Sequence, residues 1–131
     1  MGKWMMSASK KPKVTTLIKS NLEEAAENLI DQVLKPKNVN IPTPECSFNY
    51  LVDIFTKWYG NSFYFCSKYN SPGENAISPS FEMKFARMVY IGDEKFNLSY
   101  MRHNDKWFEL YRNLTIKECL NAIEHEPYFM Q

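Results

Sequence analysis

A Gly-Asn dipeptide at positions 60 and 61 lies inside the most aromatic stretch of the chain, residues 57–69. A two-residue loop of this kind predicts a tight β-hairpin of type II′, because glycine supplies the positive φ at the first corner. The loop also fixes the register of its two strands, since residues then pair in order outward from the turn. Tyr59 is therefore predicted to pair with Ser62, and each earlier residue with a later one.

This register divides the hairpin side chains between two faces, because directly opposed residues point to the same side of a sheet. The predicted inner face holds the pairs Trp58–Phe63, Thr56–Phe65, Ile54–Ser67 and Val52–Tyr69, continued by Phe48 and Tyr50. The predicted outer face holds the pairs Lys57–Tyr64, Phe55–Cys66 and Asp53–Lys68. Opposite charges, and a lysine beside an aromatic ring, are typical of a face that remains partly in water.

Three further strands are expected after the hairpin. Residues 81–85 and 96–100 alternate between apolar and polar side chains, a turn is expected at Gly92-Asp93, and residues 107–111 form the last strand. The first alternation, if continued, would bury Arg87. We favour a β-bulge at Ala86-Arg87, which would switch the phase and bury Met88 and Tyr90 instead; otherwise Arg87 points into a partly covered site.

Two helices are expected to flank the strands. The first begins at a Ser-x-x-Glu capping box at residues 20–23, carries an apolar stripe over 22–34 and ends before Pro36. The second begins at a Thr-x-x-Glu capping box at residues 115–118 and ends before Pro127. Two apolar helix stripes and one apolar sheet face are most simply buried together. The sequence therefore predicts a two-layer α+β domain, a five-stranded antiparallel meander with both helices on the same face.

The domain is predicted to occupy residues 16–131, preceded by a basic arm at residues 1–15. Residues 1–19 hold five lysines and no acidic residue. A basic arm can add affinity for phosphate groups, but a solvated, flexible terminus is the commoner case and the one we expect.

Composition and spacing argue against most catalytic chemistry. His103 and His125 are far apart and no Cys-x-x-Cys motif occurs, so no metal site is expected. Four widely separated glycines form no phosphate loop, so no nucleotide cofactor is expected either. Cys46, Cys66 and Cys119 are an odd number without a close pair, which favours reduced thiols in the cytoplasm. Apolar runs are too short to span a membrane.

The outer sheet face is the strongest candidate for a functional surface. Our first hypothesis is a non-enzymatic interaction domain that self-associates, as a homodimer, or binds another protein through Phe55, Tyr59 and Tyr64. An alternative is an accessory domain for single-stranded nucleic acid, in which these rings stack bases beside Lys57 while the lysines of the arm bind phosphates. A third is a small-molecule binding protein or small enzyme that uses a helix–sheet cleft, with Arg87 or His103 as its polar anchor.

From residue 45 to 131, the order of features resembles a family of small bacterial proteins known only as a domain of unknown function. The resemblance rests on Gly60-Asn61, residues 86–90, 96–100 and 107–111, Leu120 with Ile123, and the tail Glu126-Pro127-Tyr128-Phe129. It implies the same fold and a bacterial cytoplasmic origin. It implies no activity, cofactor or site residue.

Overall fold

The computed structural model describes residues 12–39, 49–71 and 80–129 of the chain. Its strands form one antiparallel sheet in the order β1-β2-β3-β4-β5, which confirms the predicted meander. The strands are β1 (Tyr50–Tyr59), β2 (Ser62–Asn70), β3 (Ser80–Gly92), β4 (Lys95–Met101) and β5 (Trp107–Leu114). The helical elements are α2 (Thr16–Leu29), the wide π-helical turn η1 (Ile30–Leu34), α3 (Lys35–Asn38) and α4 (Ile116–His125).

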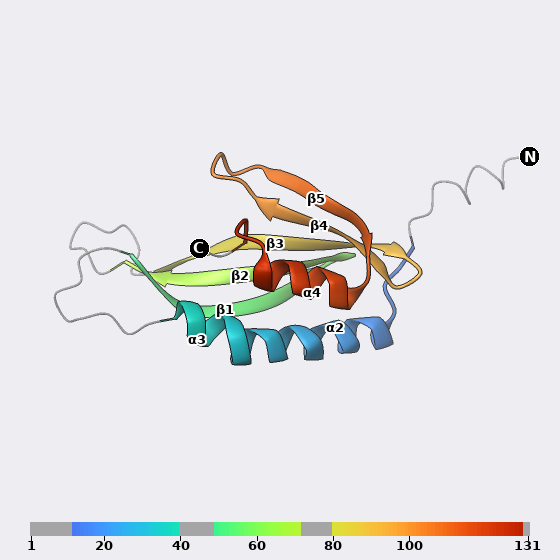
Figure 1. Cartoon of the computed structure of the whole chain (residues 1–131), viewed down its shortest axis with the longest axis horizontal. Coiled ribbons are helices and arrows are strands. Elements are labelled where there is room, and N and C mark those ends of the chain that lie inside the picture. Colours follow the sequence, from blue (N-terminus) through green and yellow to red (C-terminus); the bar gives the residue numbers. More distant parts are fainter. Residues whose placement is uncertain (1–11, 40–48, 72–79, 130–131) are drawn as a thin grey trace, which may run out of the picture.

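Both long helices cover the same face of the sheet, as predicted. Figure 1 shows α2 running along β1, with α4 in front of the middle strands. The buried side chains of the two helices and of this sheet face form one core. Its most buried members are Leu22, Ala26, Ile30, Ile54, Phe63, Phe65, Ala86, Met88, Phe96, Leu98, Cys119 and Ile123. The fold is a two-layer α+β domain, and none of the helices within residues 12–39, 49–71 and 80–129 lies on the opposite face of the sheet, which we call the helix-free face.

The first hairpin has the predicted turn and most of the predicted register. Gly60 has a φ of +61° and Asn61 has no positive φ, as a type II′ turn requires. Pairing runs from Tyr59–Ser62 to Asp53–Lys68 as expected. Beyond that point the prediction is wrong, because the register shifts between Leu51 and Asp53.

The shift changes which side chains reach the core at the far end of the hairpin. Leu51, and not Val52, lies opposite Tyr69, and Leu51 is buried in the core. Tyr50 pairs with Asn70 and therefore does not continue the inner face. Phe48, the other expected inner residue, lies outside the described residues.

A bulge in β3 switches the phase of burial, as predicted, although it lies slightly earlier in the chain. Phe65 pairs with Ala86 while Cys66 pairs with Lys84, so Phe85 is the extra residue. Met88 and Tyr90 are buried beyond it, as expected. The following turn lies one residue later than predicted. Its two central residues are Asp93 and Glu94, which both have positive φ, and Gly92 pairs with Lys95 across it.

The first helix begins earlier and ends later than predicted. Thr15 is the N-cap, and its hydroxyl accepts a hydrogen bond of 3.2 Å from the backbone N–H of Ile18. Ser20 lies inside the helix, so the expected capping box at 20–23 is wrong. Pro36 does not end the helix either, because it occupies the first turn of α3, where proline needs no N–H donor. The wide turn η1 precedes it, with Lys35 donating to the carbonyl of Ile30, five residues back.

The residues before α2 lie against the ends of two hairpins. The side-chain amide of Asn61 donates to the carbonyl of Pro12 at 2.6 Å and accepts from the N–H of Val14 at 3.4 Å. A Cβ atom on Gly92 would lie 3.5 Å from the Pro12 ring. Residues 1–11, the greater part of the predicted arm, lie outside the described residues.

The second helix has the predicted start and end. Thr115 and Glu118 form a reciprocal capping box, in which the Thr115 hydroxyl accepts from the Glu118 N–H and the Glu118 carboxylate accepts from the Thr115 N–H. These hydrogen bonds hold the pKa of Glu118 below its usual value. The helix ends at His125, two residues before Pro127.

Candidate binding surface

The helix-free face of the sheet carries three aromatic rings, each with a basic side chain over it. Lys57 Nζ lies 5.7 Å from the ring centre of Phe55, Lys84 Nζ lies 5.0 Å from that of Tyr64, and Arg87 Cζ lies 4.8 Å from that of Trp107. We call these six residues the cation–aromatic surface. A cation over an aromatic face is attracted by the negative charge density of the ring. Three such pairs on one face make it both aromatic and basic.

Arg87 lies at the centre of this surface. It pairs with Tyr64 on one side and with Ser99 on the other. Ser99 is small and fully buried, which leaves room for Trp107 to reach Arg87 and Tyr64 from β5, with ring centres of Trp107 and Tyr64 5.8 Å apart. The bulge, the favoured of the two alternatives for Arg87, is the one observed, and the guanidinium it turns to this face is partly covered.

The Arg87 guanidinium lacks the partners that usually accompany a partly buried cation. Its Nε atom is buried and has no hydrogen-bond acceptor. Within the described part of the chain, neither Arg87 nor Lys84 forms an ion pair with an acidic side chain. Partial burial of a cation without an acidic partner costs free energy. The attraction between the guanidinium and the Trp107 ring offsets part of that cost. Arg87 is thus a donor-rich group whose buried Nε has no acceptor among the described residues.

The balance of charge on the helix-free face is positive. Its basic residues in β1–β3 are Lys57, Lys68, Lys84 and Arg87, and strand pairing places the acidic residues Asp53, Glu82 and Glu109 on the same face, which leaves a net charge of 4 − 3 = +1. Glu109 also forms an ion pair with Arg112, three residues later in β5.

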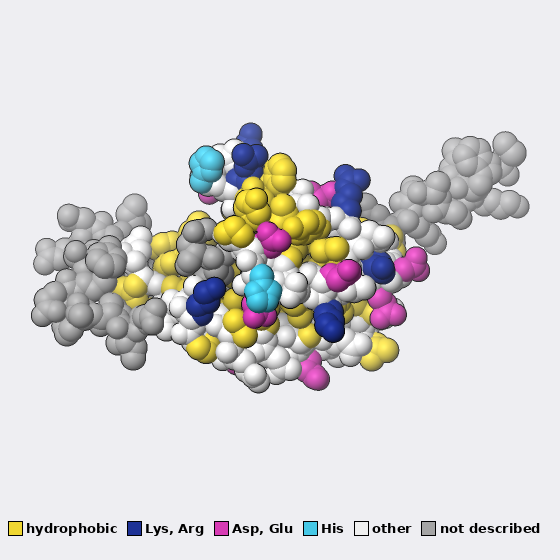
Figure 2. Space-filling model, in the orientation of Figure 1, with side chains coloured by type: hydrophobic (Ala, Val, Ile, Leu, Met, Phe, Trp, Pro, Cys, Tyr) yellow, Lys and Arg dark blue, Asp and Glu magenta, His cyan; other side chains and the backbone are white. Residues whose placement is uncertain are grey.

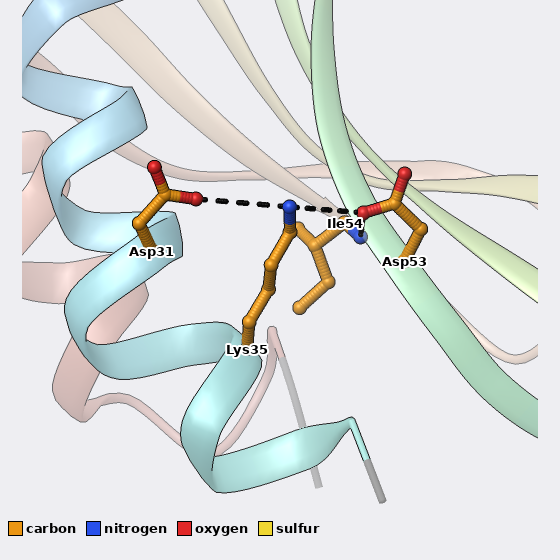
Figure 3. Close-up of polar contacts among 4 residues, drawn as sticks. All are labelled: Asp31, Lys35, Asp53 and Ile54. Carbon is orange, nitrogen blue, oxygen red and sulfur yellow. Dashed lines mark hydrogen bonds and ion pairs between the residues drawn. The ribbon is translucent and has the colours of Figure 1, made fainter. Parts of the chain in front are cut away.

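The charge of Asp53 is engaged by the helix layer, through an ion pair with Lys35 of α3. Its carboxylate lies 3.1 Å from Lys35 Nζ, and Lys35 also lies 3.6 Å from Asp31 (Figure 3). The same Asp53 oxygen accepts the backbone N–H of Ile54 at 2.9 Å. The hydrogen bond from Lys35 to Asp53 raises the pKa of the lysine. Asp53 therefore joins α3 to β1 and does not neutralise the cation–aromatic surface.

A hollow of about 260 Å³ lies over Cys66 beside Tyr64. It is lined by Lys57, Cys66, Glu82, Met83, Lys84 and Met101. At one side of it Lys57 Nζ and Glu82 Oε1 are 3.7 Å apart. Burial raises the pKa of the Cys66 thiol, and the opposing effect of Lys57 and Lys84 is smaller. The thiol therefore stays protonated at neutral pH and forms an apolar floor.

The remaining predicted site residues lie apart from this surface. Tyr59, at the end of the hairpin, is 76% exposed, and among the described contacts no ring or cation covers it. His103 is exposed in the turn between β4 and β5, and no described hydrogen bond, ion pair or ring contact joins it to Arg87. Trp107 and Lys84 complete the surface but were not among the predicted site residues. The pairing of Trp107 with Met101 across the last turn would have placed it on the correct face.

A second group of exposed rings, the tail patch, lies on the helix-bearing side and was not predicted from the sequence. Phe108, Tyr111 and Tyr128 are 43%, 37% and 48% exposed. Tyr100 lies between two of them, with ring centres 5.6 Å from Phe108 and 4.8 Å from Tyr128. The Tyr111 hydroxyl donates to the Glu126 carboxylate at 2.8 Å, which raises the pKa of Tyr111. Figure 2 shows hydrophobic side chains gathered over β4 and β5 on this side.

A groove also lies between the two helices. A hollow of about 660 Å³ lies between α2 and α4, with Ala25, Ile116 and Leu120 among its lining residues. Neither Arg87 nor His103 lines it, so the predicted polar anchors do not reach this groove.

The described residues contain neither a cluster of metal ligands nor a membrane-spanning helix. Within residues 12–39, 49–71 and 80–129, no three His, Cys, Asp or Glu side chains are grouped so that they could hold a metal ion. No helix in the same ranges is both long and apolar enough to cross a membrane.

Comparison with known proteins identifies a family without an assigned activity. The family model of the domain of unknown function DUF3024 matches residues 14–131. The match confirms the expected membership of an uncharacterised domain family. No curated protein and no solved structure matches the chain.

Proposed function

The chain belongs to the family of the domain of unknown function DUF3024, and we propose that it is a non-enzymatic domain that binds single-stranded nucleic acid on the cation–aromatic surface. The observation that carries this proposal is the set of three rings on the helix-free face, each beside a lysine or arginine. We also propose that the domain works in the cytoplasm, in keeping with its odd number of cysteines.

The chemistry of the surface suits this ligand. Proteins that bind single strands combine a basic surface, which follows the phosphates, with aromatic side chains on which bases stack. Arg87 and Lys84 supply cations without acidic partners, while Tyr64 and Trp107 supply rings. The turn that leads into Trp107 adds the exposed basic residue Lys106. Stacking contributes about 1–3 kcal/mol per base, so two rings and two cations give a modest affinity that is not strongly sequence-dependent.

The same charges weigh against self-association through this face, the first hypothesis from the sequence. A two-fold dimer brings the same patch of both copies together. The cations of the face from both copies, Lys57, Lys68, Lys84 and Arg87, would then be brought into one interface, where they outnumber the acidic residues of the face. Like charges placed against each other across an interface cost several kcal/mol. An anionic partner removes this penalty.

Fluorescence anisotropy with a labelled ten-nucleotide single strand tests the proposal. We expect binding at low salt that weakens as salt rises, since each phosphate contact releases a counterion. The double variant Lys84→Gln/Arg87→Gln should bind about tenfold more weakly. Its slope of log affinity against log salt should be shallower by about 1.4, that is 0.7 for each lost contact. Lys117→Gln, an exposed lysine on α4, is the matched control and should bind as the parent does.

The same samples decide between nucleic acid and self-association. Light scattering at micromolar concentration should give a monomer in the absence of oligonucleotide. A dimer that Phe55→Glu dissociates, together with no oligonucleotide binding at low salt, would overturn the proposal in favour of the self-associating domain.

A further inference from the structure

The hollow over Cys66 has the size and lining of a subsite for one planar ring system. At about 260 Å³ it is smaller than the roughly 300–1,000 Å³ of sites that enclose a drug-sized ligand. Its floor is apolar, because the Cys66 side chain is fully buried and Met101 lies beside it. It also adjoins Tyr64, because Lys84 both lines the hollow and lies over the Tyr64 ring. A base stacked on Tyr64 would therefore lie next to this hollow.

The polar rim of the hollow places a donor beside a two-oxygen acceptor. Lys57 Nζ and Glu82 Oε1 are 3.7 Å apart, and their side chains are about half exposed, so this ion pair is weak and exchangeable. An ionised carboxylate only accepts hydrogen bonds and can receive two parallel donors. A lysine ammonium only donates.

Guanine is the base whose pairing edge matches this rim most fully. Its edge carries two adjacent donors, N1–H and the N2 amino group, followed by the O6 acceptor. Glu82 can accept both donors while Lys57 donates to O6. Adenine, cytosine and uracil each offer a carboxylate a single donor group on that edge. We infer that the hollow bounded by Lys57 and Glu82 is a guanine-preferring subsite of the cation–aromatic surface; this inference rests on the proposed function.

Pentanucleotides that differ only in the central base test the inference by anisotropy. The flanking bases are uridines, and the central base is guanine, inosine, adenine, cytosine or uracil. We expect the guanine strand to bind at least about tenfold more tightly than the last three, the discrimination that one good bidentate contact provides. Inosine, which lacks the N2 amino group, should lose most of this preference.

Three variants separate base recognition from general binding. Glu82→Gln leaves one acceptor oxygen and should remove the guanine preference without weakening the binding of the all-uridine strand, because the substitution removes a negative charge from the face. Lys57→Gln should reduce the preference as well. Glu109→Gln removes an acidic residue of the same face that is already paired with Arg112, and should keep the preference.

The outcomes distinguish this inference from the proposed function. Equal binding of all five strands by the parent overturns the guanine subsite and leaves the proposed function intact. Failure to bind any strand overturns both. A competition experiment with guanosine monophosphate completes the test. If the free nucleotide displaces the labelled strand as well as the guanine pentanucleotide does at equal concentration, the ligand of the subsite is a free nucleotide and not a base within a strand.

Discussion

Arg87 shows how one residue can signal a change of backbone geometry. Simple alternation along β3 would point this cation into the core, at a cost that no core arrangement here could offset. The bulge at Phe85 and Ala86 resolves the conflict by burying both of these residues and turning Arg87 to the other face. The incompatibility was readable from the sequence, but the position of the extra residue depends on pairing with β2 and could not be read to the residue.

Cys119 gives a prediction at the same scale. Burial raises the pKa of its thiol to about 12. The unfolded chain releases this proton above about pH 9, whereas the folded chain retains it, so the unfolded state binds fewer protons between pH 9 and 12. Stability therefore falls as the pH rises through this window. The free energy of unfolding in urea should fall by about 1.4 kcal/mol between pH 8 and pH 10 because of this thiol alone.

Cys119→Ala is the control for this measurement, made under reducing conditions. The variant starts from a lower stability but lacks the thiol, so its loss between pH 8 and pH 10 should be smaller by the stated amount. Equal losses in parent and variant would show that the Cys119 thiolate is tolerated in the folded chain.

At the scale of single elements, locally determined features were predicted best. The two-residue turn sets its own register, and that register is correct as far as Asp53. The start of α2 was missed because two cap sequences compete, Thr15 and Ser20. The contact that selects Thr15 is tertiary: Ile18, in the extra turn, is buried in the core formed with the sheet. A sequence pattern carries no information about that contact.

The position of this cap can be tested with one pair of substitutions. Thr15→Ala removes the hydroxyl that accepts from the Ile18 N–H and should lower the free energy of unfolding by about 1 kcal/mol. Ser20→Ala, at an exposed position inside the helix, should leave stability unchanged or raise it by up to about 0.5 kcal/mol, because alanine has the higher helix propensity. Thermal or urea unfolding measures both. The reverse order of effects would place the cap at Ser20.

For the whole molecule, the two faces of the sheet have separate roles. One face packs against both helices and forms the core, while the other carries half-buried rings beneath cations. The architecture and the inner face followed from apolar stripes, which the sequence displays directly. The cation–aromatic surface did not, because Trp107 and Arg87 meet only after β3, β4 and β5 have paired with the bulges in place.

Neighbouring residues of β2 test this separation. Phe63 is fully buried against the helices, whereas Tyr64 lies on the helix-free face. Phe63→Ala should cost about 3–5 kcal/mol of stability, as large-to-small core substitutions do. Tyr64→Ala should cost no more than about 1–2 kcal/mol, the loss of ring contacts at a half-exposed site, yet should weaken oligonucleotide binding by about tenfold.

Urea unfolding and anisotropy on the two variants, each at a temperature where it is folded, give the readouts. Full oligonucleotide affinity in Tyr64→Ala would remove this ring from the binding surface. A loss of stability equal to that of Phe63→Ala would instead make it a structural residue.

The wide turn η1 has a consequence for how related sequences should be aligned. A turn with five-residue hydrogen-bond spacing holds one residue more than an ordinary helical turn at the same length of axis. A relative that built this helix without the widening would therefore show a single-position gap between residues 30 and 34, with both flanks still in register. In such a relative the counterpart of Lys35 would still face β1, because only the widened turn is missing, and the acidic partner at position 53 should be retained.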